Sequence, residues 1–191
     1  MKKYNFGKDE DYLLAHNCLG ITTYEDLENA EQYVFIIRSL QVENGTYVLD
    51  SFTMNSLQNL HRHLFRDIYD FAGDIRSVQL AKGTTQFCQF QYIAAISSDI
   101  FTKIAAEKNW STVEEAAKKL AYYKAELNML HPFREGNGRA IRIFIQYYAK
   151  SKGYDWQYAN IDSQEYMLAM IASVHNSTKL QRLFFKTLVK L

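Results

Sequence analysis

The chain has 191 residues, 48% of them hydrophobic and 15% aromatic, which suffices for a sizeable core in one domain and leaves no room for a second catalytic domain. The net charge of +1 and the pI near 7.7, with basic residues scattered along the chain, exclude the electrostatic footprint of a nucleic-acid-binding protein. Two cysteines, Cys18 and Cys88, are too few and too far apart to hold a metal cluster.

The N-terminal segment, residues 1–10, lacks the apolar stretch of a secretion signal, and no run in the chain approaches the roughly 18 apolar residues of a membrane span. A pair of reduced thiols is the default for cytosolic proteins. We therefore expect a cytoplasmic protein that binds neither a membrane nor nucleic acid directly.

The first predicted helix covers about 26–40, where apolar residues recur at helical spacing, and a turn is predicted at 44–45. A second helical stretch, within residues 60–76, contains His61 and His63. Because residues two apart point to different faces of a helix, we expect core and surface roles for these histidines rather than a shared zinc ion.

Helical spacing breaks after Arg76, and two short runs rich in β-forming residues flank Lys82 and Gly83. This pattern predicts a β-hairpin over about 77–90, with Lys82, Gly83 and Thr84 at its tip. A hairpin that only closes the core and a hairpin that binds a partner are equally compatible with this sequence.

Helical spacing returns over 113–130, and Pro132 predicts that this helix ends at His131, because a proline disfavours helical backbone in the residue before it. Further helices are expected at about 139–150, 163–174 and 177–190. The pattern predicts an all-α helical bundle with one β-hairpin, built as a single domain over 1–191, with the helices on either side of His131 and Gly138 at its centre.

The segment from His131 to Arg142 reads His-Pro-Phe-Arg-Glu-Gly-Asn-Gly-Arg-Ala-Ile-Arg and combines a base, an acid, an anion-binding loop and two arginines. Gly136 and Gly138 flank Asn137 and allow backbone N–H groups to converge without a Cβ in the way. The loop opens a helix, whose free N–H groups and positive dipole end favour a bound anion.

The charged residues of this segment fit the same chemistry. Arg139 and Arg142, three residues apart, share a helix face and can grip phosphate oxygens. Glu135 offers a hard oxygen ligand for Mg²⁺, and His131 can take a proton from an incoming hydroxyl. Taken singly, a helix-ending histidine is more often a surface residue, and a Gly-Asn-Gly run is more often a turn. The combination indicates a phosphate-transfer site.

The segment matches the HxFx(D/E)GNGRxxR signature at every fixed position, so the chain resembles the Fic domain family, whose members mostly transfer AMP from ATP to protein hydroxyls. Residues 60–76 also resemble the region that precedes the flap of this family. The resemblance spans roughly residues 15–175 and implies the Fic fold, with ATP and Mg²⁺ at the site. It implies that His131 is the general base, that Phe133 anchors the loop in the core, and that Glu135 holds Mg²⁺.

The resemblance assigns the α and β phosphates to Gly136, Asn137 and Gly138, and it assigns the clamping of the polyphosphate to Arg139 and Arg142. The predicted hairpin then corresponds to the flap beside the active site, whose edge pairs with an extended segment of the target protein. Such strand addition supplies main-chain hydrogen bonds with little demand on the target's side chains.

Regulation is the open question of this sequence. Fic proteins are commonly silenced by a helix bearing (S/T)xxxE(G/N), whose glutamate pairs with the second motif arginine, here Arg142. One match occurs, from Ser39 to Asn44, which makes Glu43 a possible inhibitory residue. The same residues are equally typical of a helix stop and turn with a solvated Glu43. In the absence of a convincing inhibitory helix, the resemblance implies restraint by a separate small antitoxin protein.

The leading hypothesis is a protein adenylyltransferase that modifies a Ser, Thr or Tyr hydroxyl and is the toxin of a bacterial toxin-antitoxin pair. The resemblance further suggests subunits of the type II topoisomerases, DNA gyrase and topoisomerase IV, as targets. Alternatives are the transfer of another phosphate-containing group, the removal of AMP with Glu43 as an activating residue, and a nucleotide-binding module without transfer.

Overall fold

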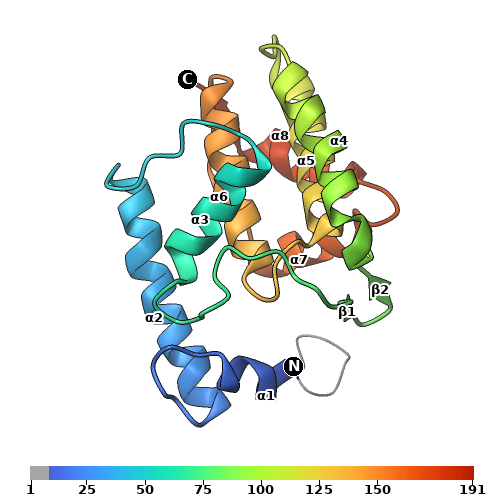
Figure 1. The fold of residues 1–191 in the computed structure, drawn as a ribbon. Helices are drawn as coiled ribbons and strands as arrows, with labels where there is room; N and C mark the ends of the chain where they lie inside the picture. Colours follow the sequence, from blue (N-terminus) through green and yellow to red (C-terminus); the bar gives the residue numbers. More distant parts are fainter. Residues whose placement is uncertain (1–8) are drawn as a thin grey trace.

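The computed structural model describes residues 9–191, which form eight α-helices and two small sheets (Figure 1). The helices are α1 (Asp9–Ala15), α2 (Tyr24–Glu43), α3 (Met54–Phe65), α4 (Ile93–Ala106), α5 (Val113–Leu130), α6 (Asn137–Ser151), α7 (Ser163–Ala172) and α8 (Thr178–Thr187). Most of the N-terminal segment in which we expect no secretion signal, residues 1–8, lies outside the described residues. The helical content confirms the all-α prediction.

Several helices begin where the sequence supplies a side-chain cap. Thr23, Thr53 and Thr112 have extended backbone, and each hydroxyl accepts a hydrogen bond from the backbone N–H three residues later. Asp162 does the same for α7 through two N–H groups. Because the first N–H groups of a helix have no partner within it, each such cap contributes on the order of 1 kcal/mol.

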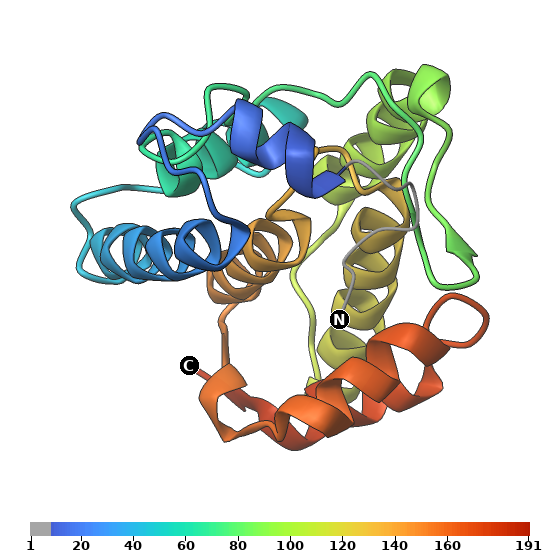
Figure 2. The same cartoon turned by 90° about the horizontal axis from the view of Figure 1, so that it is seen from below.

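The centre of the molecule is the pair α5 and α6, as the sequence predicts. Helix α6 lies between α3 and α5 and packs against both, while α8 covers another side of α5 (Figure 2). Leu127, Phe144 and Tyr148 of this pair are almost completely buried. The two helices are therefore held rigidly on either side of the loop that joins them, residues 131–136.

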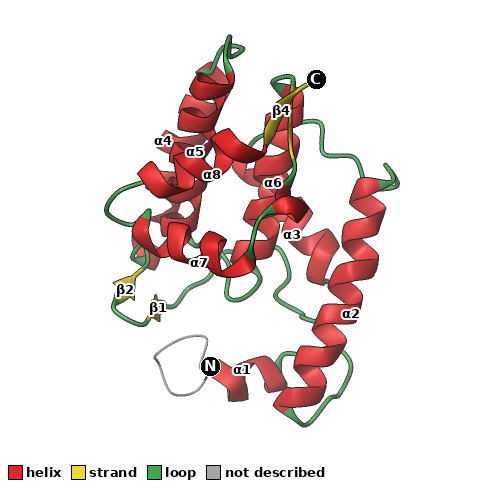
Figure 3. Cartoon of the chain, turned by 180° about the vertical axis from the view of Figure 1, so that it is seen from behind, coloured by secondary structure: helices red, strands yellow, loops and turns green. Residues whose placement is uncertain are grey.

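Within residues 9–191 the structure has four short strands, drawn in yellow in Figure 3. Strands β1 (Ala81–Lys82) and β2 (Thr85–Gln86) form an antiparallel hairpin, which is shorter than the range 77–90 that the sequence suggests.

The second sheet was not predicted. Strand β3 (Tyr154–Trp156) pairs with β4 (Leu188–Lys190), so the last helix ends at Thr187 rather than near 190. The helical period continues through Leu188, and the sequence does not reveal that buried Trp156 lies opposite it. None of the helices within residues 9–191 is long and apolar enough to cross a membrane.

Candidate active site

His131 ends helix α5 with an unusual backbone. Its φ of 44° and ψ of 61° are left-handed, and it is the one non-glycine residue with positive φ in the described part of the chain. The helix ends at this residue as predicted, and the backbone there is left-handed. Strained backbone of this kind costs on the order of 1–3 kcal/mol and persists where the surroundings over-determine it. The imidazole turns back toward α5, where its Nδ1 lies against the Asn128 carbonyl.

The hydrogen bonding of the imidazole fixes which nitrogen is basic. His131 Nδ1 lies 3.0 Å from the carbonyl oxygen of Asn128, and because a carbonyl only accepts, Nδ1 must donate. The lone pair therefore belongs to Nε2. Burial, followed by the charges of Arg76, Lys82 and Lys124, lowers the pKa of His131 to about 3, so the ring is neutral at physiological pH. A neutral Nε2 is the form that a general base requires.

The hairpin is attached directly to this histidine. Phe87, which follows β2, stacks on the His131 ring with the centroids 3.6 Å apart and the planes 11° apart. Residues Lys82, Gly83 and Thr84 at the hairpin tip are exposed. The structure thus places the predicted flap next to the predicted base, with its tip open to solvent.

Arg76 links the base of the hairpin to the loop of residues 131–136, here called the motif loop. The sequence did not reveal this role. The buried guanidinium donates hydrogen bonds to the carbonyl oxygens of His131 at 2.7 Å, Val78 at 2.5 Å and Cys88 at 2.5 Å. Its backbone N–H donates to the Pro132 carbonyl at 2.9 Å. With a longer hydrogen bond to the Leu130 carbonyl at 3.4 Å, these charge-assisted bonds help to hold the strained backbone of His131.

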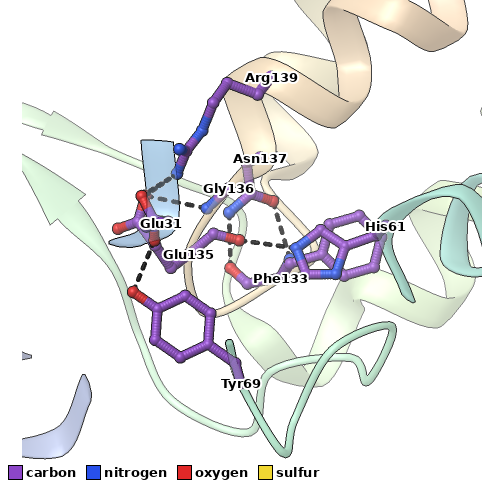
Figure 4. A network of polar contacts seen from close by, with 8 residues as sticks. All are labelled: Glu31, His61, Tyr69, Phe133, Glu135, Gly136, Asn137 and Arg139. Carbon is purple, nitrogen blue, oxygen red and sulfur yellow. Dashed lines mark hydrogen bonds and ion pairs between the residues drawn. The ribbon is translucent and has the colours of Figure 1, made fainter. Parts of the chain in front are cut away.

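The motif loop is held in shape by side chains inside it and behind it (Figure 4). Asn137 accepts a hydrogen bond from the Phe133 N–H at 2.8 Å and donates to the Phe133 carbonyl at 2.7 Å. This side chain therefore bridges the N–H and the carbonyl of Phe133 and fixes the loop, while the backbone N–H of Asn137 lies in the first turn of α6 and can contribute to an anion site. Phe133 is completely buried and stacks on His61 at 3.9 Å, as expected of an anchor.

His61 supports the loop from α3. Its Nδ1 accepts a hydrogen bond from the Gly73 N–H at 2.9 Å, so its Nε2 carries the proton and donates to the Glu135 carbonyl at 2.8 Å. Burial lowers the pKa of His61 to about 3. His63 instead lies beside the Arg38 carbonyl, 3.3 Å from its Nε2, on another side of α3.

The two glycines of the loop serve different purposes. Gly136 has φ +75°, and a Cβ there would lie 2.5 Å from Cε2 of Phe65, so both backbone and packing require glycine. Gly138 has helical backbone within the first turn of α6, and a Cβ there would meet no atom within 4 Å. The space at Gly138 suits a ligand that approaches the helix N-terminus closely.

Glu135 is suited to bind a divalent cation. Its Oε1 accepts a hydrogen bond from the Gly136 N–H at 2.9 Å, whereas its buried Oε2 has no hydrogen-bond partner within residues 9–191. A buried, unpaired carboxylate oxygen is costly unless a ligand completes it. This oxygen therefore fits a Mg²⁺ ion, for which hard oxygen ligands are preferred.

Arg139 is surrounded by acidic groups. Its Nη2 donates to Oε1 of Glu31 at 2.5 Å and lies 3.5 Å from Oε1 of Glu135, and the Tyr69 hydroxyl donates to the other oxygen of Glu31 at 2.5 Å (Figure 4). Burial alone would lower the pKa of Arg139, but the two carboxylates outweigh it and raise that pKa. Glu31, from α2, is almost completely buried and was not singled out from the sequence.

Arg142 has a different environment, although Phe35 of α2 lies beside both motif arginines. Its guanidinium lies 4.4 Å from the ring centroid of Tyr158 and 5.8 Å from that of Phe35. Within the described residues it forms no ion pair with a carboxylate. Glu43, the possible inhibitory residue, is exposed at the end of α2 and is not paired with Arg142, so its regulatory role stays a prediction.

Comparison with protein-family models shows the family to which this chain belongs. Residues 51–149 match the model of the Fic/DOC family, which is more than half of the chain. The chain belongs to the Fic/DOC family. The matched range contains α3, the hairpin, the motif loop and nearly all of α6.

Curated relatives carry names that state an activity. Protein adenylyltransferase VbhT of Bartonella schoenbuchensis is 32% identical over 187 residues, which is 94% of this chain but 39% of VbhT, so the chain spans well under half the length of that relative. "Probable protein adenylyltransferase Fic" of Escherichia coli is 32% identical over 192 residues, covering 96% of this chain and 94% of the relative.

Solved structures agree with the fold. BepC of Bartonella tribocorum, solved with AMPPNP, superposes with a TM-score of 0.81 at 20% identity, over 92% of each chain. The N-terminal Fic domain of a Bartonella quintana effector, solved with ADP, gives a TM-score of 0.82 at 20% identity, over 91% of this chain and 90% of that chain. At this identity the likeness concerns the fold alone.

Proposed function

We propose that this protein is a protein adenylyltransferase that transfers AMP from ATP to a Ser, Thr or Tyr hydroxyl of a target protein. The observation that carries the proposal is the neutral His131, whose basic Nε2 lies in one loop with the glycines and arginines of an anion site. Membership in the Fic/DOC family and the names of the curated relatives support the same activity.

In the proposed reaction, His131 Nε2 takes the proton of the target hydroxyl as its oxygen attacks the α phosphorus of ATP. The new bond joins the hydroxyl oxygen to the α phosphorus, the bond from that phosphorus to the bridging oxygen breaks, and pyrophosphate leaves with the electron pair. The hydrogen bond to Asn128 and the stacking on Phe87 keep Nε2 in a fixed direction during this step.

The phosphate groups have defined candidates in this chain. The N–H groups at the start of α6 and the space beside Gly138 suit the α and β phosphates, with Asn137 taking part through its backbone. Arg139 and Arg142 supply the positive charge. A Mg²⁺ ion held by Glu135 would neutralise polyphosphate charge when bound.

The hairpin is proposed as the docking site of the target. Its tip, residues 82–84, is exposed, while Phe87 and Arg76 fix its base beside His131. An extended target segment that pairs with the hairpin edge would place one hydroxyl near Nε2 without strong demands on the neighbouring sequence.

Restraint of this activity is assigned to a separate protein. Glu43 is exposed and does not reach Arg142, and Arg142 forms no ion pair with a carboxylate within residues 9–191. This leaves the second arginine available, which supports an antitoxin partner and hence a toxin acting in the cytoplasm. Subunits of type II topoisomerases are the first targets to test. Unimpaired growth of cells that express the active chain alone would count against the toxin assignment.

The activity is tested by incubating the purified protein and its His131→Ala variant with Mg²⁺, cell lysate and ATP labelled at the α phosphate. We expect labelled protein bands with the wild type, and a signal about 10²–10⁴-fold lower with the variant. Transfer of a γ label instead would show that the site transfers a phosphoryl group. Equal α labelling by both proteins would contradict the role of His131.

A further inference from the structure

Lys124 is a buried cation to which the proposed AMP transfer assigns no role. It lies on α5 two helical turns before His131, and its side chain is only 1% exposed. No carboxylate within the described residues forms an ion pair with it. A lysine is almost never buried to this degree without a partner, because removing its charge from water is costly.

The amine lies on the same side of the site as Arg142. Its nitrogen is 5.9 Å from the ring centroid of Tyr166, that ring lies 5.2 Å from the ring of Tyr158, and Tyr158 in turn lies against the Arg142 guanidinium at 4.4 Å. Lys124 is six residues before the end of α5 and Arg142 is five residues after the start of α6, so both lie at a similar depth from the motif loop.

Electrostatics connect Lys124 to the reacting groups. Burial and then the charge of Arg142 lower its pKa to about 7, and its own charge contributes to the lowered pKa of His131. Lys124 and Arg142 thus form one cluster with the two tyrosines, and neither cation forms an ion pair with a carboxylate within residues 9–191. Such a cluster is stabilised when an anionic ligand with several oxygens enters it.

We propose that Lys124 is a further phosphate-binding residue, which together with Arg142 holds the β and γ phosphates of ATP and neutralises the pyrophosphate as it leaves. This inference rests on the proposed AMP transfer. When the bond between the α phosphorus and the bridging oxygen breaks, the electron pair stays on the pyrophosphate, and the Lys124 ammonium donates hydrogen bonds to its oxygens while no bond to lysine forms.

The test compares the affinities of the wild type and Lys124→Met for AMPPNP, AMP and pyrophosphate by calorimetry in the presence of Mg²⁺. We expect the variant to bind AMPPNP and pyrophosphate about 10–100-fold more weakly and AMP equally well, because only the first two carry the distal phosphates. Lys118→Met, an exposed lysine on the same helix, is the matched control and should change none of the three affinities.

The variant should fold, because methionine fills the site of an unpaired buried cation without its charge, and its thermal unfolding midpoint should match or exceed that of the wild type. Lys124→Gln replaces it if the methionine variant does not unfold cooperatively. Unchanged AMPPNP affinity, or an equal loss for AMP and AMPPNP, overturns the inference and leaves AMP transfer untouched. Failure of the wild type to bind AMPPNP overturns the proposed function, and this inference with it.

Discussion

The two motif arginines are three residues apart on one helix, yet their surroundings are opposite in charge. Arg139 lies between the carboxylates of Glu31 and Glu135, with Tyr69 completing the cluster. Arg142 lies against an aromatic ring and shares its surroundings with the cation of Lys124.

Under the proposed function, this difference indicates that the two arginines have different roles in binding one nucleotide. Acidic groups on the Arg139 side hold that guanidinium in place before any ligand binds, and the unpaired oxygen of Glu135 can take a metal ion. The Arg142 side keeps its positive charge uncompensated by protein carboxylates, which suits the highly charged distal phosphates. Substitutions on the two sides should therefore have different effects on AMP transfer and on stability.

Replacing each arginine by glutamine should separate the two sides. For Arg142→Gln we expect AMP transfer to fall by about 10²–10³-fold with little change in stability, because its guanidinium forms no ion pair with a carboxylate within residues 9–191. Arg139→Gln should lose transfer and also about 2–4 kcal/mol of stability, since it removes the guanidinium that pairs with the buried Glu31 carboxylate. Denaturant unfolding and α-label transfer measure the two effects. Equal stabilities of the two variants would contradict the contrast.

The two loop glycines allow the next comparison. Gly136→Ala forces a Cβ against Phe65 at positive φ, and we expect a loss of about 2–4 kcal/mol in the free energy of unfolding. Gly138→Ala meets no atom within 4 Å, so the free protein should be as stable as the wild type or slightly more so. Its affinity for AMPPNP should nevertheless fall. If Gly138→Ala binds nucleotide normally, the phosphates do not approach this position.

Glu31 and Glu43 lie on the same helix. Replacing each of them shows how much the buried carboxylate of Glu31 contributes to stability. Glu31→Gln keeps the shape but removes the charge that holds Arg139, and we expect a loss of about 1–3 kcal/mol, reduced by the partial exposure of the guanidinium. Glu43→Gln, an exposed change of the same kind, should be neutral within about 0.5 kcal/mol. Thermal unfolding of both variants measures this, and a neutral Glu31→Gln would show that Arg139 is held by other groups.

Two buried histidines predict how stability depends on pH. His61 and His131 have pKa values of about 3 in the folded protein and near 6.5 when unfolded, so between these values the unfolded chain binds more protons. Stability should therefore fall as pH drops below about 6.5, by on the order of 1–2 kcal/mol over the first pH unit. Denaturant midpoints at pH 7 and 5.5 measure it, and His131→Asn should show a smaller slope. A midpoint independent of pH would contradict the burial of both rings.

The helices and the motif loop could be predicted from local patterns. Apolar spacing and Pro132 are short-range signals, and they located the central pair α5 and α6 and the end of α5. The second sheet could not be predicted, because β3 and β4 are more than 30 residues apart and each is only three residues long.

The site was predictable only where its residues are consecutive. Glu31 and Arg76 come from elements 55 or more residues before His131, and no spacing rule links a buried glutamate on α2 to an arginine on α6. Lys124 was missed for a different reason, since a lysine among alanines and tyrosines in a helix is normally a solvated residue.

The proposed function requires that both sides of the site act on one ATP molecule to transfer its AMP unit. The most direct measurement is the mass added to a target protein after reaction with wild-type protein, ATP and Mg²⁺, with the modified residue located by fragmentation. The account predicts one AMP unit on a Ser, Thr or Tyr, and none with His131→Ala. A phosphoryl unit, or the same AMP adduct formed by His131→Ala, would contradict it.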